Sequence, residues 1–548
     1  MKKNKYLTII AGVALASLTL SSCVGDLNQT PLDPKVTTAS VTFSNQSLPY
    51  IQFLAKIYAG FSTGGIVGGD ASVDITGYDG GSQAGYIRPL WNMEVLPTDE
   101  AICCWQSDGT LLNFHPLNWT ATNPYINGFY SRLYYQITIA TAFLQETTAA
   151  QLTARGCSAS LTDSINTFRA EARFLRAMCY ANILDLFRNG PYVDDNSSLG
   201  TSTLPPYATA QQLFNFVVSE LNDCQTSLLP ATVGYNSSTY GHVNQAAAWS
   251  LLARLYLNAD TYLGTTGTTQ YYTNCITNCN KVIAAGYSLE PTYQNLFLTD
   301  NYQSNEIILP NIYDGTKLET WGGLTFLESS AVNSTIQSIT NAPGDWAGNR
   351  TLPEFLARFT SEESNYTLDT RYAMLYQGFN HPSVDDNTQF TQGTPVLKFR
   401  NYSSTGVLGT APNYATGAFP IFRLADIYLM YAEAVLRGGT GGSTATALTY
   451  VNALRDRAEG SGGFTDLEIT ASQLTLPFIL EERARELFWE CTRRSDLVRF
   501  GMFTSSSYLW QWKGGAKEGQ GVDSHLNIYP LPSSDLAANP NLKQNPGY

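Results

Sequence analysis

The sequence predicts a mainly α fold, a tetratricopeptide-like scaffold of helical hairpins interrupted by a long loop-rich segment. Three observations predict it. Apolar residues recur at spacings of 3 and 4 along several segments, as in helices that bury one face. Two pairs of such segments follow each other closely, at 243–285 and 423–458, like the helix pairs of repeats of about 34 residues. Between them, residues 287–419 are rich in Gly, Asn, Thr, Ser and Asp and show little helical periodicity.

The first 22 residues have the pattern of an export signal. Three lysines among the first five residues precede an apolar run over 6–20, and Cys23 follows two serines. The run is shorter than the roughly 20 residues that span a membrane comfortably. A small-residue triplet ending in Cys is the form used by bacterial lipoproteins, so we predict a signal peptide over 1–22 and lipidation of Cys23. The alternative is an ordinary secretory signal followed by a chance cysteine.

Residues 23–45 are polar and contain two prolines, which predicts a lipidated tether. Residues 46–548 are predicted to form a single domain. Its helical scaffold is expected at about 125–286 and 420–548, and its loop-rich binding segments at about 70–125 and 287–419. Long irregular segments inside a folded domain usually carry function, so these segments are expected to form the binding face.

The helices are expected in a simple order along the chain. Segments 129–145, 171–187 and 210–228 precede the first hairpin, which pairs the Ala- and Leu-rich segment 243–258 with 271–285. The second hairpin pairs 423–436 with 444–458. Segment 171–187 is the clearest helix: Gly190 and Pro191 end it, and its apolar positions are Phe174, Leu175, Met178, Cys179, Ile183, Leu186 and Phe187.

Composition excludes some classes of ligand. The net charge is −13 and no basic run occurs, which argues against nucleic acid, because binding to phosphates needs clustered Lys and Arg. Aromatic residues make up 12% of the chain, with 33 Tyr and 9 Trp. In polar loops such rings suit a surface that faces sugar or peptide, although many of them are expected in the core.

Metal and cofactor sites are not expected. The four histidines are scattered and no Cys-x-x-Cys pair occurs, so a zinc site has little support. Acidic loops such as Asp385-Asp386 could hold calcium, but no ligand-spaced motif is present. The cysteines after Cys23 are even in number, which permits disulfides in an exported protein without requiring them. They stand at positions 103, 104, 157, 179, 224, 275, 279 and 491.

Six strings together resemble the SusD/RagB family of outer-membrane nutrient-capture lipoproteins. They are EARFLRA (171–177) with PYV (191–193), GHVNQAAA (241–248) with LARLY (252–256), NEII (305–308), FRLADIYLMYAEA (422–434), EERAREL (481–487) with RSDLVRFG (494–501), and YPLP (529–532) with NLKQNPGY (541–548). Each is weak alone, but in this order behind a lipoprotein signal they are specific and cover nearly the whole chain.

The resemblance implies a non-enzymatic lid. Family members capture an oligomer at the cell surface and close it into a SusC-like TonB-dependent transporter barrel. We therefore expect a lipid-anchored protein of the outer membrane that faces the extracellular side and has an oligosaccharide as its ligand.

Three loop segments also resemble the starch-binding branch of that family, in which an arc of aromatic rings stacks on the sugar. They are LPTDE (96–100) before Trp105, YDGT (313–316) leading to WGGLTF (321–326), and PGDWAGNR (343–350). The resemblance implies that Trp105, Trp321 and Trp346 stack on the glycan. It also implies that the polar partners of the sugar hydroxyls are Arg88, Asp108, Asp345 and Asn349. In that branch an amide is expected in place of Asp108, and a Tyr is expected near Trp321. These two differences leave the identity of the sugar open, with malto-oligosaccharide as the first candidate.

Two other functions stay open. The same fold could capture a peptide, which a deep pocket with charged walls would favour. An exported glycoside hydrolase would need two carboxylates about 5 to 10 Å apart in a cleft. The charged string 481–494 is instead expected to be ion-paired scaffold, with Glu481 and Arg485 as an i,i+4 pair. Trp510 and Trp512 could form a second surface or a transporter contact.

Overall fold

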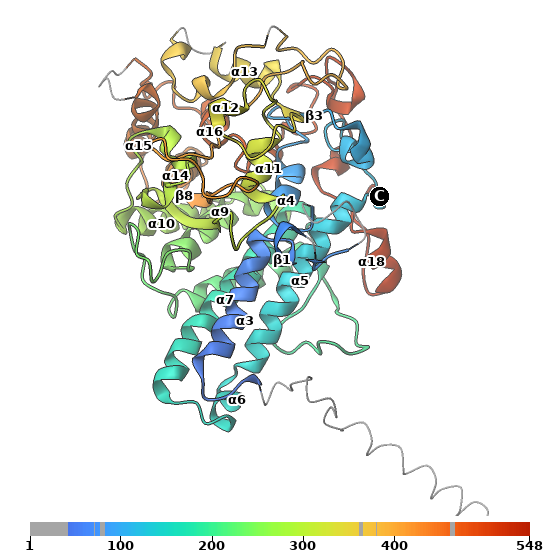
Figure 1. The fold of residues 1–548 in the computed structure, drawn as a ribbon, viewed down its shortest axis with the longest axis vertical. Helices are drawn as coiled ribbons and strands as arrows, with labels where there is room; N and C mark the ends of the chain where they lie inside the picture. Colours follow the sequence, from blue (N-terminus) through green and yellow to red (C-terminus); the bar gives the residue numbers. More distant parts are fainter. Residues whose placement is uncertain (1–41, 71, 77–82, 361–364, 380, 461–465) are drawn as a thin grey trace, which may run out of the picture.

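A computed structural model describes residues 42–548, apart from 71, 77–82, 361–364, 380 and 461–465. The predicted signal peptide, Cys23 and most of the predicted tether lie outside the described residues. The predicted fold class is confirmed: helices dominate, and a loop-rich segment separates the two helical blocks along the sequence (Figure 1).

The helices of the first half include the expected ones in order and three that were not predicted, at 47–62, at 87–94 within the predicted loop-rich segment, and at 149–154. They are α3 (Ser47–Ser62), α4 (Ile87–Glu94), α5 (Pro124–Glu146), α6 (Ala149–Ala154), α7 (Ala159–Leu186), α8 (Ala210–Cys224), α9 (Gln245–Leu263) and α10 (Thr269–Ala284). Polar residues begin most of them: the side chains of Asn123, Ser158, Thr209 and Asn244 accept backbone N–H groups of α5, α7, α8 and α9. Such caps supply partners for the first N–H groups of a helix.

The second half contains a shorter helical block. It holds α14 (Leu424–Leu436), α15 (Thr444–Glu459), α16 (Leu476–Leu487), α17 (Arg493–Arg499) and α18 (Ser533–Ala538). Among its described residues, the segment between the blocks carries the short helices α11 (Gly323–Ser329), α12 (Gln337–Thr340) and α13 (Pro353–Thr360), several 3₁₀ turns and a few strands.

Successive helices pack on one another across this long insertion. Helix α7 packs on α5 and α8, α8 on α9, α9 on α10, and α14 on α15. Helix α14 also packs directly on α10, although more than a hundred residues separate them in the sequence. The insertion therefore leaves and re-enters a continuous helical stack, and the stack fixes both of its ends.

The strands are short and, in the part of the chain that the structure describes, form two-stranded antiparallel pairs. The longest pair joins β6 (Ile307–Tyr313) to β8 (Gly417–Arg423), and so ties the start of the insertion to its end. The others pair β1 (Gly65–Val67) with β2 (Ser72–Val73), β3 (Ile102–Cys103) with β7 (Asn349–Arg350), and β4 (Gly190–Pro191) with β5 (Tyr207–Ala208).

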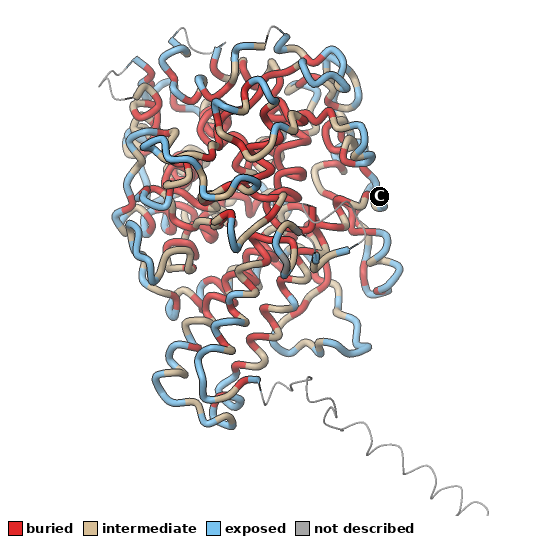
Figure 2. Tube along the Cα trace, viewed as in Figure 1, coloured by how far each residue is buried: buried red, intermediate tan, exposed pale blue. Residues whose placement is uncertain are grey.

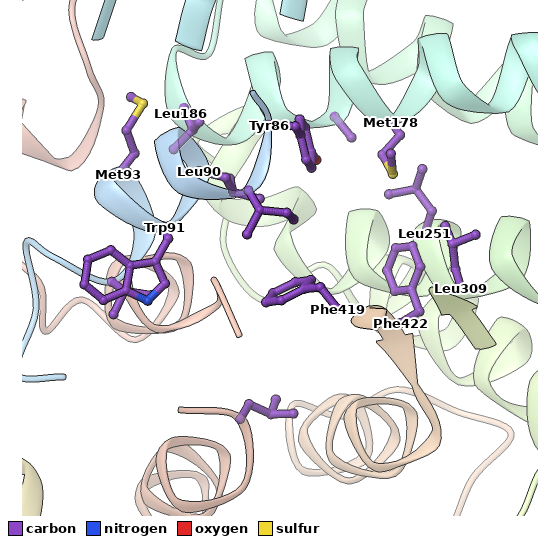
Figure 3. Packing of buried hydrophobic residues seen from close by; sticks show 14 of the residues in the cluster. Tyr86, Leu90, Trp91, Met93, Met178, Leu186, Leu251, Leu309, Phe419 and Phe422 are labelled. Atoms are coloured by element: carbon purple, nitrogen blue, oxygen red, sulfur yellow. The ribbon is translucent and has the colours of Figure 1, made fainter. Parts of the chain in front are cut away.

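The main core lies where α4, α7, α9 and the β6–β8 pair meet. Figure 2 shows buried residues filling this region, whereas many residues at the ends of α3 and α7 near α6 are exposed. Figure 3 shows side chains from these elements converging, among them Leu90, Trp91, Met178, Leu251, Leu309, Phe419 and Phe422. This core supports the N-terminal loop segment and the insertion from behind.

A buried ion-pair network joins α16 to the insertion. Glu486 of α16 accepts from Arg423 at 2.6 Å, from Arg457 at 2.5 Å and from Arg371 at 3.0 Å. The predicted ion pair between Glu481 and Arg485 is wrong, because Arg485 pairs with Glu482, at 2.8 Å. Glu481 instead lies 3.3 Å from Arg358 of α13. Each carboxylate thus faces the guanidiniums that the tertiary fold presents to it.

The eight cysteines at 103, 104, 157, 179, 224, 275, 279 and 491 are free thiols, and all but Cys157 and Cys491 are buried. Among the described residues, no group of three or more His, Cys, Asp or Glu is placed to hold a metal ion. Across the same residues, none of the helices combines the length and the apolar character that crossing a membrane requires.

Candidate functional site

The β3–β7 pair brings two of the predicted indoles together. Ile102 lies opposite Arg350, and Cys103 lies opposite Asn349, so the chain after β3 runs beside the chain before β7. The N–H of Cys104 donates to the Gly348 carbonyl at 3.0 Å. The indole N–H of Trp105 then donates to the backbone carbonyl of Trp346 at 3.3 Å.

The ring of Trp105 rests on a glycine and on a line of aromatic rings from the core. An ideal Cβ at Gly348 would lie 1.8 Å from a ring carbon of Trp105, so only glycine leaves room for the indole there. Trp105 also meets Phe326 of α11, with ring centroids 6.4 Å apart. Phe326 in turn packs on the fully buried Trp91 of α4 at 5.2 Å. Trp105 therefore packs against side chains that are themselves held in the core.

Trp346 and Trp321 continue the aromatic surface beside the two ends of α11. Trp321 stands just before this helix, and the N–H of Trp346 donates to Ser329, the last residue of α11, at 3.0 Å. The two indole centroids are 6.1 Å apart with planes inclined by 50°. Tyr414 also contacts Trp321, with ring centroids 4.8 Å apart and planes inclined by 53°. The rings therefore form an arc of inclined planes rather than one flat wall.

Arg88 and Asp108 form the polar edge of the arc beside Trp105. Arg88 comes from α4, whose residues are all buried, and its guanidinium carbon lies 5.6 Å from the ring centroid of Trp105 and 4.7 Å from that of Phe326. Its nearest nitrogen is 3.9 Å from the Asp108 carboxylate. The Tyr125 hydroxyl donates to the Asp108 backbone carbonyl at 3.0 Å and holds that turn in place.

The other two polar candidates lie in different surroundings. Asp345 is exposed beside Trp346. Asn349 is only 1% exposed, which argues against the predicted direct contact with a ligand at the surface. Within the part of the chain that the structure describes, neither its side-chain oxygen nor its nitrogen has a hydrogen-bond partner. Asn349 lies in β7, opposite the buried Cys103 of β3.

Sequence reasoning missed Tyr414 and Phe326. Phe326 ends the string WGGLTF without a feature that marks it as part of the site, and Tyr414 stands in a Gly-, Asn- and Thr-rich stretch with no distinguishing pattern. The idea that Trp510 and Trp512 form a second surface is wrong for Trp510, which is fully buried. Trp512 is half-buried and donates to the Val384 carbonyl at 2.7 Å.

Gly348→Ala is expected to weaken ligand binding at the arc at least about tenfold, because the new methyl group must displace the Trp105 ring and binding sites tolerate small displacements poorly. Gly85→Ala is the matched control, since a Cβ at Gly85 meets nothing within 4 Å. Equilibrium binding and thermal unfolding of both variants would check this. Equal affinities in two folded variants would contradict the role given to the Trp105 ring.

Comparison with known proteins identifies sequences and structures that are similar to this chain. The model of the SusD family matches residues 258–548. The starch-binding protein SusD of Bacteroides thetaiotaomicron is 32% identical over 593 aligned residues that cover 100% of both chains. A crystal structure of a SusD homolog from the same organism matches with a TM-score of 0.72 at 17% identity, covering 94% of this chain and 100% of that one. The surface glycan-binding protein A of Bacteroides fluxus matches at a TM-score of 0.66 and 18% identity, over 92% and 100% of the two chains. The whole-length identity and the family match together show that this chain belongs to the SusD family.

Proposed function

We propose that this protein binds an oligosaccharide on the arc formed by Trp105, Trp346 and Trp321. Sugar rings present flat C–H faces surrounded by hydroxyl groups. Half-buried indoles offer apolar planes for those faces, and Asp108 and the exposed Asp345 offer charged groups to the hydroxyls. Arg88 is buried, so its part in the proposed site is to hold Asp108, 3.9 Å away. The observation that carries the proposal is that three separate loop segments bring their indoles to one place, with Trp321 and Trp346 6.1 Å apart.

An α-glucan, first of all malto-oligosaccharide, is the proposed ligand. Neighbouring rings in the arc are inclined by 50° and 53°. Inclined planes suit a chain that curves, as α-glucans do, better than a flat ribbon. The relative that is 32% identical over the whole chain is a starch-binding protein, which supports the same choice.

We further propose that the captured glycan passes to a TonB-dependent transporter in the outer membrane. Anchoring through a lipid on Cys23, with the domain facing the cell exterior, would hold the protein beside such a transporter. The lipoprotein pattern of residues 1–23 and membership of the SusD family support this part of the proposal.

Capture without catalysis fits the arc better than the two alternatives. The surface consists mainly of aromatic faces, and the Asp108 carboxylate at its edge lies 3.9 Å from a guanidinium of Arg88. Glycosidases use a pair of carboxyl groups that flank the scissile bond, whereas aromatic planes dominate this surface. Peptide capture would favour a deep pocket with charged walls, whereas the indoles favour sugar.

The experiment is affinity electrophoresis of the protein from residue 24 onward in native gels that contain amylopectin, levan, xylan or mannan. We expect retardation in the amylopectin gel and no release of reducing sugar from the polysaccharide. Retardation by a different glycan would replace the α-glucan assignment. Retardation by none would contradict polysaccharide capture, and sugar release would contradict a non-catalytic role.

A further inference from the structure

Three tyrosines form a second aromatic surface from loops that do not contribute to the arc. Tyr235 and Tyr240 lie in the loop before α9, and Tyr302 lies in the 3₁₀ turn Asn301–Gln303. The ring centroid of Tyr235 is 4.9 Å from that of Tyr302 and 5.4 Å from that of Tyr240. Tyr240 and Tyr302 are 6.2 Å apart. We call these three residues the tyrosine cluster.

The tyrosine cluster is open to solvent. Tyr235 is 53% exposed and Tyr302 is 37% exposed, so ring area remains available although the rings touch each other. Scattered exposed apolar residues are ordinary on a protein surface, but contiguous ones often mark an interaction site.

The backbone on both sides of the tyrosine cluster is held in place. The Asn236 carbonyl accepts the N–H of Tyr240 at 2.8 Å, and its side chain accepts the N–H of Ser238 at 3.0 Å. Asn301 donates from its side chain to the carbonyls of Leu296 and Ala418, at 2.8 and 2.7 Å. The rings are therefore presented in a fixed arrangement before any ligand arrives, which lowers the entropy cost of binding.

Polar groups stand beside the rings. The Tyr240 hydroxyl is buried and has no hydrogen-bond partner among the described residues. Tyr240 lines a cavity of about 40 Å³ whose walls also include Thr239, His242, Asn244 and Ser304. A buried hydroxyl without a partner is costly and invites an outside donor or acceptor.

We propose that the tyrosine cluster is a second carbohydrate-binding site. The exposed rings of Tyr235 and Tyr302 would stack on the C–H face of a sugar, and the hydroxyl groups of that sugar would meet the polar wall of the neighbouring cavity. Tyrosine suits this role because one residue combines an apolar plane with a hydrogen-bonding tip. The inference rests on the proposed function in one respect, namely that the ligand is a glycan, and it adds a second contact for a long polymer.

The test compares polymer with short oligosaccharide. A polymer can occupy two sites at once, whereas a short chain occupies one, so loss of the second site should affect the polymer alone. In Tyr235→Ala/Tyr302→Ala we expect affinity for amylopectin in native gels to fall at least about tenfold. Calorimetric titration with maltoheptaose should give an affinity within about twofold of the wild-type value, because the arc is intact.

Two controls accompany the double variant. Tyr235→Phe/Tyr302→Phe keeps both rings and should retain most of the affinity for amylopectin. Phe390→Ala removes an exposed ring elsewhere, 45% exposed, and should change nothing. Equal melting temperatures would show that all variants fold alike.

The outcomes separate the two proposals. If the wild-type protein is retarded by amylopectin and the alanine variant is retarded equally, the second site is overturned and the proposed function stands. If the alanine variant loses maltoheptaose affinity as well, the tyrosines act on the arc and the second site is again overturned. If no glycan retards the wild-type protein, both proposals fail.

Discussion

Replacing Trp105 with alanine is expected to weaken glycan binding by at least about a hundredfold and to abolish retardation in the amylopectin gel. The indole lies against Gly348 and Phe326 and donates to the Trp346 carbonyl, so the substitution removes a stacking plane together with a contact that holds the neighbouring indole. Aromatic anchors at the centre of a binding surface are often worth about 2 to 4 kcal/mol, and about 2.7 kcal/mol corresponds to a hundredfold change in affinity.

Two further variants serve as an intermediate case and as a control for Trp105→Ala. Trp105→Phe keeps an aromatic plane and loses the indole N–H, so its affinity should lie between those of the alanine variant and the wild type. Trp249→Phe changes a half-buried indole of α9 and should leave binding unaltered. A Trp105→Ala protein that melts at the wild-type temperature and binds glycan with wild-type affinity would remove Trp105 from the site.

Replacing Glu486 with alanine is expected to lower the free energy of unfolding by about 3 to 5 kcal/mol, because removing one partner of a buried ion pair leaves uncompensated charge. Glu486 is fully buried and faces Arg423, Arg457 and Arg371. Burial alone would raise the pKa of Glu486, but the three guanidiniums outweigh it and lower this pKa to about 2.

Urea denaturation at pH 7 measures the expected loss. Because the pKa of Glu486 in the folded protein lies below the ordinary glutamate value, the ionised carboxylate stabilises the fold at every pH above that ordinary value. This contribution to stability disappears as the pH falls towards about 2. The difference between the wild type and Glu486→Ala should therefore shrink in acid. Glu518→Gln, on the exposed surface, should cost no more than about 0.5 kcal/mol. Equal stabilities of the Glu486 variant and the wild type at pH 7 would contradict the importance of the network.

The helical scaffold was predictable because its signal is local. Apolar spacing in segment 171–187 marks the buried face of α7, and α9 and α10 follow from the first predicted hairpin with shifts of a few residues at their ends. Packing of α14 on α10 across the insertion depends on the whole stack, and no local pattern in either helix encodes it.

The candidate site was predictable only in part, because long-range pairing builds it. The three indoles were identified through family resemblance, but the two-residue pair β3–β7 that brings Trp105 to Trp346 leaves no periodic trace in the sequence. The same pairing buries Asn349, which the sequence placed at the ligand. Tyr414 joins the arc through its contact with Trp321, which depends on the path of a loop more than ninety residues away.

Hydroxyl-radical footprinting of the tryptophans, with and without saturating maltoheptaose, tests the central claim most directly. The account predicts that Trp105, Trp321 and Trp346 become protected from oxidation, while the half-buried Trp249 and Trp512 react at unchanged rates. Three indoles that remain as reactive with the glycan as without it would contradict the claim that this surface captures the sugar.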